Sequence, residues 1–138
     1  EPIRHDDHAG CAMVARALTT PVQIGENFSL PQDMERALAG QACGYVMPDL
    51  ERIGGVTGWQ RAAELAHARD ISMSSHLYPE VSAHLLAVTP TAHWLEVLDS
   101  AGGLRRARLA LRDGMLQAWD TPGIGIEWDA EAVARHRA

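Results

Sequence analysis

The chain has 138 residues, which suits one domain with a substantial core, and its 12 basic and 18 acidic side chains give a formal net charge of −6. This acidic balance opposes binding to nucleic-acid phosphates, and no apolar run reaches the roughly 18–20 residues of a membrane span. The sequence contains no lysine, which excludes Schiff-base chemistry and a lysine general base from this segment.

Four short apolar runs recur along the chain, and each ends in an ionisable residue. The runs are residues 22–26, 44–49, 71–76 and 92–96, and their last residues are Glu26, Asp49, His76 and Glu96. Short apolar runs bounded by turn residues are typical of buried strands. We therefore expect four strands, each with an ionisable residue at its carboxyl end.

Helical patterns fill the intervals between these runs. They are expected within residues 9–18, 31–38, 57–66 and 80–88. Ser29 with Gln32, and Thr57 with Gln60, fit the capping-box pattern, and Pro31 suits the first turn of a helix. Strands that alternate with helices are typical of parallel βαβ units.

Residues 100–138 follow a different pattern. Asp113-Gly114 separates the runs 104–112 and 115–119, which is a signature of a β-hairpin. Asp129 is expected to cap a short terminal helix.

The one basic cluster of the chain also lies in this tail. It consists of Arg105, Arg106 and Arg108. Because charged side chains are rarely buried, we interpret the cluster as a solvated strand edge.

Cys11 and Cys43 each stand alone in apolar surroundings. Disulfides form and persist in oxidising compartments, and this pattern does not resemble a disulfide framework. We therefore expect free thiols in a reducing compartment and a cytoplasmic location.

The repeated units favour an α/β fold over residues 1–99. Four units of about 25 residues make half of a TIM-type (β/α) barrel, which needs about 250 residues. The alternative, a doubly wound open sheet, usually carries a Gly-rich phosphate turn after its first strand. The Gly-rich loop at residues 53–58 fits neither a dinucleotide-binding fingerprint nor a P-loop. The expected architecture is therefore a half-barrel, followed over residues 100–138 by a β-hairpin and a terminal helix.

The four strand-end residues predict a proton-abstraction site, because the carboxyl ends of barrel strands converge on one mouth. An Asp beside a His orients the imidazole and stabilises its protonated form, which makes a competent general base. One Glu can donate to a developing oxyanion, and another can ligate a hard divalent cation. Taken singly, each residue also fits a helix cap or a polar helix entrance.

Several blocks of the sequence resemble the mandelate racemase / muconate lactonizing enzyme family of the enolase superfamily, in its mandelate racemase branch. They are VQIGEN (22–27), MPD (47–49), IGGVTGW (53–59), MSSHL (73–77), SAHLLA (82–87), TPTAHWLE (89–96) and PGIGI (122–126). The resemblance covers essentially the whole chain, with the blocks at matching spacing. It implies that the four strands are strands five to eight, the second half of the barrel.

The resemblance also implies a role for each strand-end residue. Glu26 would be a Mg2+ ligand at the end of the fifth strand. His76 would be the base that removes or returns the α-proton of a carboxylate substrate, with Asp49 as its partner. Glu96 would be the acid that hydrogen-bonds the substrate carboxylate as it becomes an enediolate, so that His76 and Glu96 both contact the substrate. Glu1-Pro2 resembles the end of the family's Glu-Glu-Pro block, whose first Glu is a metal ligand.

Two reactions share this half-barrel in the family, one an isomerase and one a lyase. With a lysine base on the second strand, a two-base site gives a racemase of a 2-hydroxy acid. Without that lysine, the His/Asp pair removes the α-proton and helps to expel a β-hydroxyl, which gives a sugar-acid dehydratase. The alternative is a non-catalytic half-barrel, a fragment or subunit whose activity needs the amino-terminal half.

The implied partners are a small carboxylate substrate, the amino-terminal half of the same enzyme, and further copies in a homo-oligomer. Residues 100–138 are expected to pack on the capping domain of the amino-terminal half. No nucleic-acid or membrane partner is expected.

Overall fold

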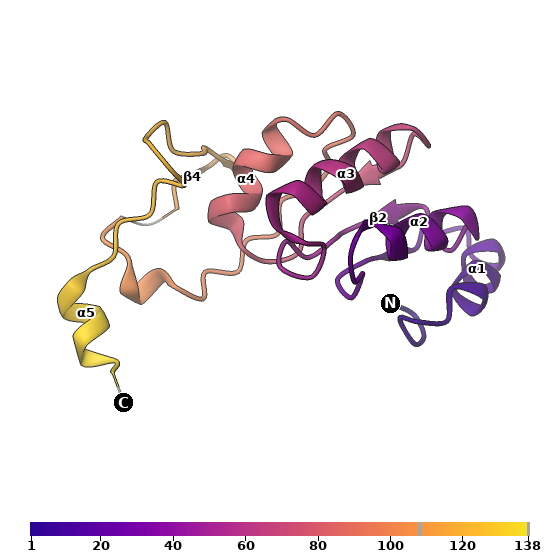
Figure 1. Cartoon of the computed structure of the whole chain (residues 1–138), viewed down its shortest axis with the longest axis horizontal. Helices are drawn as coiled ribbons and strands as arrows, with labels where there is room; N and C mark the ends of the chain where they lie inside the picture. The colour runs from indigo at the N-terminus through magenta and orange to yellow at the C-terminus, as the bar shows by residue number, and fades with distance from the viewer. Residues whose placement is uncertain (108, 138) are drawn as a thin grey trace.

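Three short parallel strands, separated by helices, form the first part of the chain (Figure 1). The computed structural model describes residues 1–107 and 109–137. The strands are β1 (Gln23–Ile24), β2 (Tyr45–Val46) and β3 (Ser72–Met73), and the helices are α1 (His8–Ala17), α2 (Pro31–Ala39), α3 (Gly55–His67) and α4 (Pro79–Ala87). No described helix is long and apolar enough to cross a membrane.

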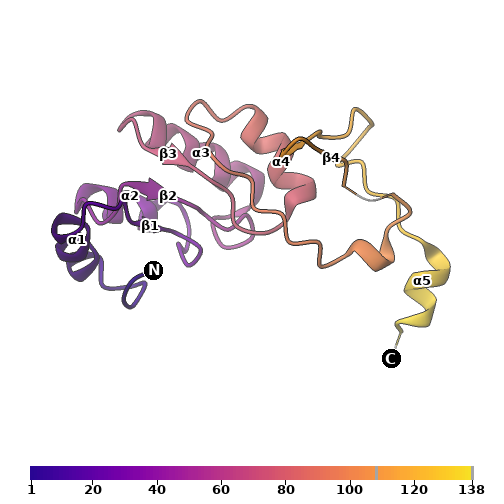
Figure 2. The ribbon, with the colours of Figure 1, turned by 180° about the vertical axis from the view of Figure 1, so that it is seen from behind.

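The strands pair in chain order, β1 with β2 and β2 with β3, all in parallel. A doubly wound sheet reverses its strand order at a switch point, and the described strands show no such reversal. Figures 1 and 2 show α2, α3 and α4 on one side of the sheet. Sequential parallel strands with helices on one face form half of a (β/α) barrel, as predicted.

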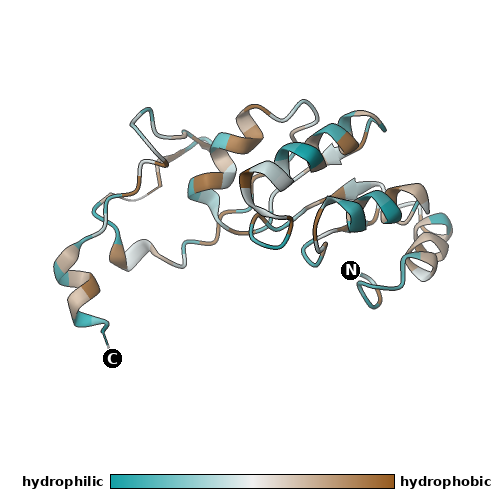
Figure 3. Cartoon of the chain, in the orientation of Figure 1, coloured by the Kyte–Doolittle hydropathy of each residue, from teal (hydrophilic) through white to brown (hydrophobic). Residues whose placement is uncertain are grey.

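The second residue of each strand points into the core between the sheet and the helices. Ile24, Val46 and Met73 are buried, whereas the first residue of each strand is partly exposed. Trp59 of α3 is buried in the same core, where its indole N–H donates to Thr89 Oγ1 at 3.1 Å. Figure 3 shows hydrophilic residues on α2 and α3, on the side of these helices that faces away from the sheet. Because successive side chains of a strand point to opposite faces, the first residue of each strand lies on the other face of the sheet, toward the barrel interior.

The fourth predicted strand, residues 92–96, is an extended segment rather than a regular strand. The Met73 N–H donates to the Thr91 carbonyl at 2.8 Å, and the His93 N–H donates to the Met73 carbonyl at 2.9 Å. An isolated parallel bridge pairs Met73 with Ala92. The segment therefore occupies the place of a fourth strand beside β3.

The tail contains the hairpin and the terminal helix that the sequence predicts. β4 (Leu111–Arg112) and β5 (Met115–Leu116) are antiparallel, and Asp113 and Gly114 between them have φ of 49° and 75°. Positive φ at both central residues is the type I′ geometry that Asp-Gly favours. The side chain of Asp129 accepts hydrogen bonds from the backbone N–H groups of Glu131 and Ala132 in the first turn of α5 (Ala130–Arg135). A 3-10 helix, η1 (Gly102–Leu104), begins the tail.

Both predicted capping boxes are wrong. α2 follows Leu30, which has φ of 69° and whose N–H donates to the Arg52 carbonyl at 3.1 Å. α3 follows Gly54, which has φ of 99°, so that Thr57 lies inside the helix. The starts of both helices are set by the preceding loops, because these loops pack against each other.

The prediction of a solvated basic edge is wrong for Arg105. Its side chain is only 1% exposed and forms ion pairs with Glu80, at 3.2 Å, and with Asp99. Two carboxylates compensate for the water that the guanidinium loses on burial. Arg106 is exposed, as predicted, and Arg108 lies outside the described residues.

Both cysteines are free thiols, in agreement with the sequence-based expectation. Cys11 is buried and Cys43 partly buried. Burial raises the pKa of Cys43 to about 12, so this thiol stays protonated at neutral pH.

Arg105→Ala should lower the free energy of unfolding by about 3 kcal/mol, because it leaves the carboxylate of Glu80 without its buried partner. Urea denaturation followed by circular dichroism measures this change. Arg106→Ala is the matched control and should leave the midpoint nearly unchanged. Equal effects of the two substitutions would contradict a structural role for the ion pairs.

Candidate active site

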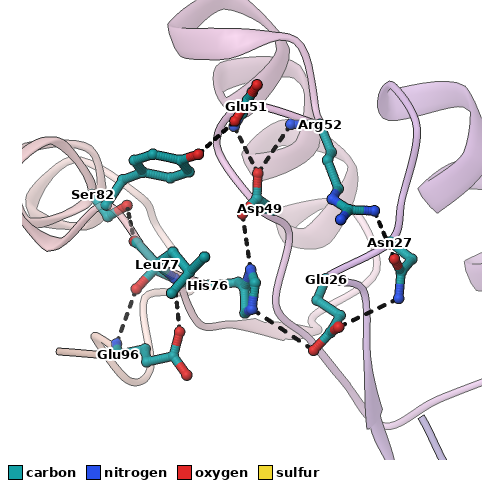
Figure 4. A network of polar contacts seen from close by, with 11 residues as sticks. Glu26, Asn27, Asp49, Glu51, Arg52, His76, Leu77, Ser82 and Glu96 are labelled. Carbon is teal, nitrogen blue, oxygen red and sulfur yellow. Dashed lines mark hydrogen bonds and ion pairs between the residues drawn. The ribbon is translucent and has the colours of Figure 1, made fainter. Parts of the chain in front are cut away.

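The side chains of Asp49 and His76 meet at the carboxyl ends of β2 and β3. The register that pairs Tyr45 with Ser72 continues to an isolated parallel bridge between Asp49 and His76. The His76 Nδ1 lies 2.8 Å from the Asp49 Oδ2 (Figure 4). The structure thus brings together two residues, 27 positions apart, that the sequence predicts as a pair.

Asp49 is held on both sides of its carboxylate. The Oδ1 accepts the backbone N–H of Glu51 at 2.9 Å and that of Arg52 at 3.0 Å, and the residue is only 3% exposed. Because this carboxylate acts only as an acceptor, the proton of the neutral His76 ring lies on Nδ1. The Nε2 lone pair is therefore free to take a proton.

Glu26 lies on the other side of the His76 ring. Its Oε2 is 3.7 Å from the His76 Nε2, and its side chain is 47% exposed. Its Oε1 accepts a long hydrogen bond of 3.4 Å from the Asn27 Nδ2, and the Asn27 Oδ1 accepts from Arg52 at 2.7 Å. Glu26 is thus oriented by its neighbours while one oxygen remains open to a ligand.

The donor chemistry of Glu26 suits a hard divalent cation, which binds carboxylate oxygens. The described residues hold no group of three or more His, Cys, Asp or Glu side chains arranged to bind a metal ion. Near Glu26, the carboxylate of Glu1 accepts the Gly25 N–H at 3.3 Å, which places the start of the chain beside the end of β1. Glu26 therefore fits as one ligand of a site completed by other oxygen donors.

Glu96 joins the site through the turn after β3. Its Oε2 accepts the Leu77 N–H at 2.7 Å, and its own N–H donates to the Ser75 Oγ at 3.0 Å. Figure 4 shows His76 between Glu26 on one side and Glu96 on the other. Because Oε2 takes the Leu77 N–H, a proton on Oε1 could be donated to a substrate oxygen.

Polar residues on the inner face of the sheet were missed by the sequence reasoning. The Ser74 hydroxyl donates to the Gln23 Oε1 at 3.3 Å and lies 3.4 Å from the His93 Nδ1. The His93 ring stacks on Tyr45, with ring centroids 5.0 Å apart. The available signal was polar residues at alternate positions of otherwise apolar runs, such as Ser74 two positions before His76.

Comparison with known proteins gives a consistent picture. Residues 1–133 match the family described as Enolase C-terminal domain-like. The L-talarate/galactarate dehydratase of Salmonella typhimurium is 33% identical over 132 residues, which cover 96% of this chain and 33% of that enzyme. The chain spans about one third of the length of the curated relatives it matches.

Solved structures resemble the chain over almost its whole length. An enolase from Bradyrhizobium, complexed with magnesium and mandelic acid, is 45% identical with a TM-score of 0.94, and the match covers 98% of this chain and 37% of that one. A racemase from Streptomyces coelicolor with bound magnesium is 30% identical with a TM-score of 0.91, again over 98% of this chain and 37% of that one.

Asp49→Asn should move the proton of the His76 ring. The amide oxygen of the new side chain would accept the two backbone N–H groups, so that its NH2 group would face Nδ1 and force this atom to accept. We expect 15N NMR to show the Nδ1–H tautomer in the wild type and the Nε2–H tautomer in the variant. Asp70→Asn, at an exposed residue with φ of 53°, is the control and should not alter His76. Retention of the Nδ1–H form in Asp49→Asn would contradict the conclusion that Asp49 keeps the proton of the His76 ring on Nδ1.

Proposed function

This chain belongs to the Enolase C-terminal domain-like family, within the mandelate racemase/muconate lactonizing part of the enolase superfamily, and from this membership we propose that it forms the carboxyl-terminal half of a magnesium-dependent enzyme. The enzyme would abstract the α-proton of a 2-hydroxy acid or sugar acid. The observation that carries the proposal is the His76 ring, whose Nδ1 is held by Asp49 while its Nε2 points toward Glu26. A general base needs this arrangement of one fixed and one free ring nitrogen.

In the proposed reaction, the His76 Nε2 takes the α-proton. The positive charge that forms on the ring is stabilised by the buried Asp49 carboxylate beside it, at 2.8 Å. Glu96 would donate a hydrogen bond from its Oε1 to the substrate carboxylate as negative charge develops there. Its Oε2 stays anchored to the Leu77 N–H during this step.

Glu26 is the proposed metal ligand of this chain, and the remaining ligands would come from the amino-terminal half. When bound, a magnesium ion would neutralise charge on the substrate carboxylate and so make the α-proton more acidic. The half-exposed side chain of Glu26, with one oxygen directed toward the His76 Nε2, supports this role.

Proton abstraction can lead to two products, and the residues of this chain at the candidate active site suit both reactions. A proton returned to the carbon gives racemisation, which needs a second base on the other face of the substrate. A proton donated by the His76 Nε2 to a β-hydroxyl gives dehydration. Both activities occur in the names of the relatives, so the product of the reaction has to be identified by experiment.

Residues 100–138 would pack on the capping domain of the amino-terminal half. A cavity of about 470 Å³ separates the start of α4 from the tail. Leu98, Ile124 and Trp128 line this cavity and remain 57%, 43% and 52% exposed. Such a concentration of exposed apolar side chains supports a covered surface in the complete enzyme. Assembly into a homo-oligomer and a cytoplasmic location are part of the same proposal.

His76→Asn in the complete enzyme should slow exchange of the substrate α-proton by at least about 1,000-fold, because the base is removed. Exchange is measured by proton NMR in deuterated water with mandelate, galactarate and L-talarate as test acids, and the same spectra reveal any dehydrated product. His67→Asn, at an exposed residue of α3, is the matched control. Exchange that survives in His76→Asn would show that another group is the base.

Glu26→Gln should weaken Mg2+ binding by about tenfold or more, because the neutral amide is a poorer ligand of a hard cation. Isothermal titration calorimetry of the complete enzyme measures the affinity without substrate. Glu64→Gln, at an exposed residue of α3, controls for the loss of one negative charge. Equal Mg2+ affinities of wild type and Glu26→Gln would remove Glu26 from the ligand set.

A further inference from the structure

The turn after His76 holds two consecutive residues in the left-handed conformation. Leu77 has φ of 53° and Tyr78 has φ of 48°, and neither is glycine. This conformation costs free energy for residues with a Cβ, so it persists only where surrounding contacts hold it. The turn is therefore held by its neighbours at a position directly beside the proposed base.

The start of α4 holds the turn from one side. The Ser82 Oγ donates to the Leu77 carbonyl at 3.0 Å, and the Ser82 N–H donates to the Tyr78 carbonyl at 2.9 Å. In this conformation the Leu77 N–H points toward Glu96, whose Oε2 accepts it at 2.7 Å. The same turn thus sets the direction of the carboxylate proposed as the acid.

A side-chain contact joins the turn to the loop that follows β2. The Tyr78 hydroxyl donates to the Glu51 Oε2 at 2.5 Å. Glu51 belongs to the loop that holds Asp49, because its backbone N–H donates to the Asp49 Oδ1. The two loops are therefore joined twice, by Asp49 and His76 within the site and by Glu51 and Tyr78 outside it.

The Tyr78 phenol keeps its proton at neutral pH and can therefore donate to Glu51. The hydrogen bond to Glu51 raises the pKa of Tyr78, so the phenol remains a donor through neutral and mildly alkaline pH. Tyr78 is 38% exposed and Glu51 is exposed, so loss of the hydroxyl would open no cavity in the core. The contact therefore orients the turn and does not bury side-chain surface in the core.

We propose that Tyr78 is a positioning residue. Its contact with Glu51 fixes the conformation of the turn at residues 77 and 78. This turn holds the His76 ring and the Glu96 carboxylate in place. The proposal rests on the proposed function, in which these two groups act on one substrate. Neither Tyr78 nor Glu51 needs to contact that substrate.

The test compares Tyr78→Phe, Glu51→Ala and the double variant in the complete enzyme, with the acid that the wild type exchanges fastest. Alanine removes the acceptor at position 51, whereas the amide oxygen of a glutamine could still accept the Tyr78 hydroxyl. Each single variant should lower kcat for α-proton exchange about tenfold, since a small misplacement of reacting groups has effects of this size, with KM changed less than about twofold. The double variant should be no slower than either single variant, because both remove the same contact. Glu64→Ala, at an exposed residue of α3, is the matched control for the loss of an exposed carboxylate.

Hydrogen exchange at the backbone provides a readout that does not depend on activity. In Tyr78→Phe, the Leu77 N–H should exchange about tenfold faster, while the N–H of Leu86 within α4 should be unaffected. An unchanged kcat in Tyr78→Phe overturns the proposal, and so does a lower kcat with unchanged exchange at Leu77. Failure of the proposed function is distinct, because the wild type itself would then exchange no α-proton with any test acid.

Discussion

The pairing of Asp49 with His76 depends on the register of β2 and β3, and the rest of the site is arranged around it. This register pairs residues 27 positions apart, from Tyr45 and Ser72 to Asp49 and His76. Side chains that are level in neighbouring parallel strands point to the same face of the sheet. A slip of one residue would turn one member of the pair toward the helices and abolish the contact.

Glu26 and Glu96 stand outside this regular pattern. The register of β1 and β2 pairs Gln23 with Tyr45, 22 positions apart, so Glu26 is level with Pro48 rather than with Asp49. Gly25, with φ of 137°, breaks the alternation between them, and a Cβ there would lie 2.9 Å from the Phe28 ring. Glu96 is likewise level with Leu77 and not with His76, because Met73 is paired with Ala92. Irregular backbone therefore brings both carboxylates to the mouth.

Charged side chains have different partners in the candidate active site and in the tail. Asp49 and Glu96 are fixed by backbone N–H donors, which orient a carboxylate without neutralising it. Glu26 has a long hydrogen bond to Asn27 and lies 3.7 Å from the His76 Nε2, and its side chain remains half-exposed, which leaves it available to an outside ligand. Arg105, by contrast, is buried between two carboxylates and serves to attach the tail to α4.

The sequence by itself determined the order of the elements, the hairpin at Asp113-Gly114 and the ionisable residues at the strand ends, because apolar runs and turn residues act locally. The burial of Arg105 depends on Glu80, which lies 25 positions away, and local patterns carry no information on such contacts. The directions of Glu26 and Glu96 were also decided by the tertiary structure. The backbone angle at Gly25 decides which way the next side chain, that of Glu26, points. The Glu96 carboxylate is directed by the N–H of Leu77, which lies 19 positions away along the chain, and the spacing of the residues does not show this contact.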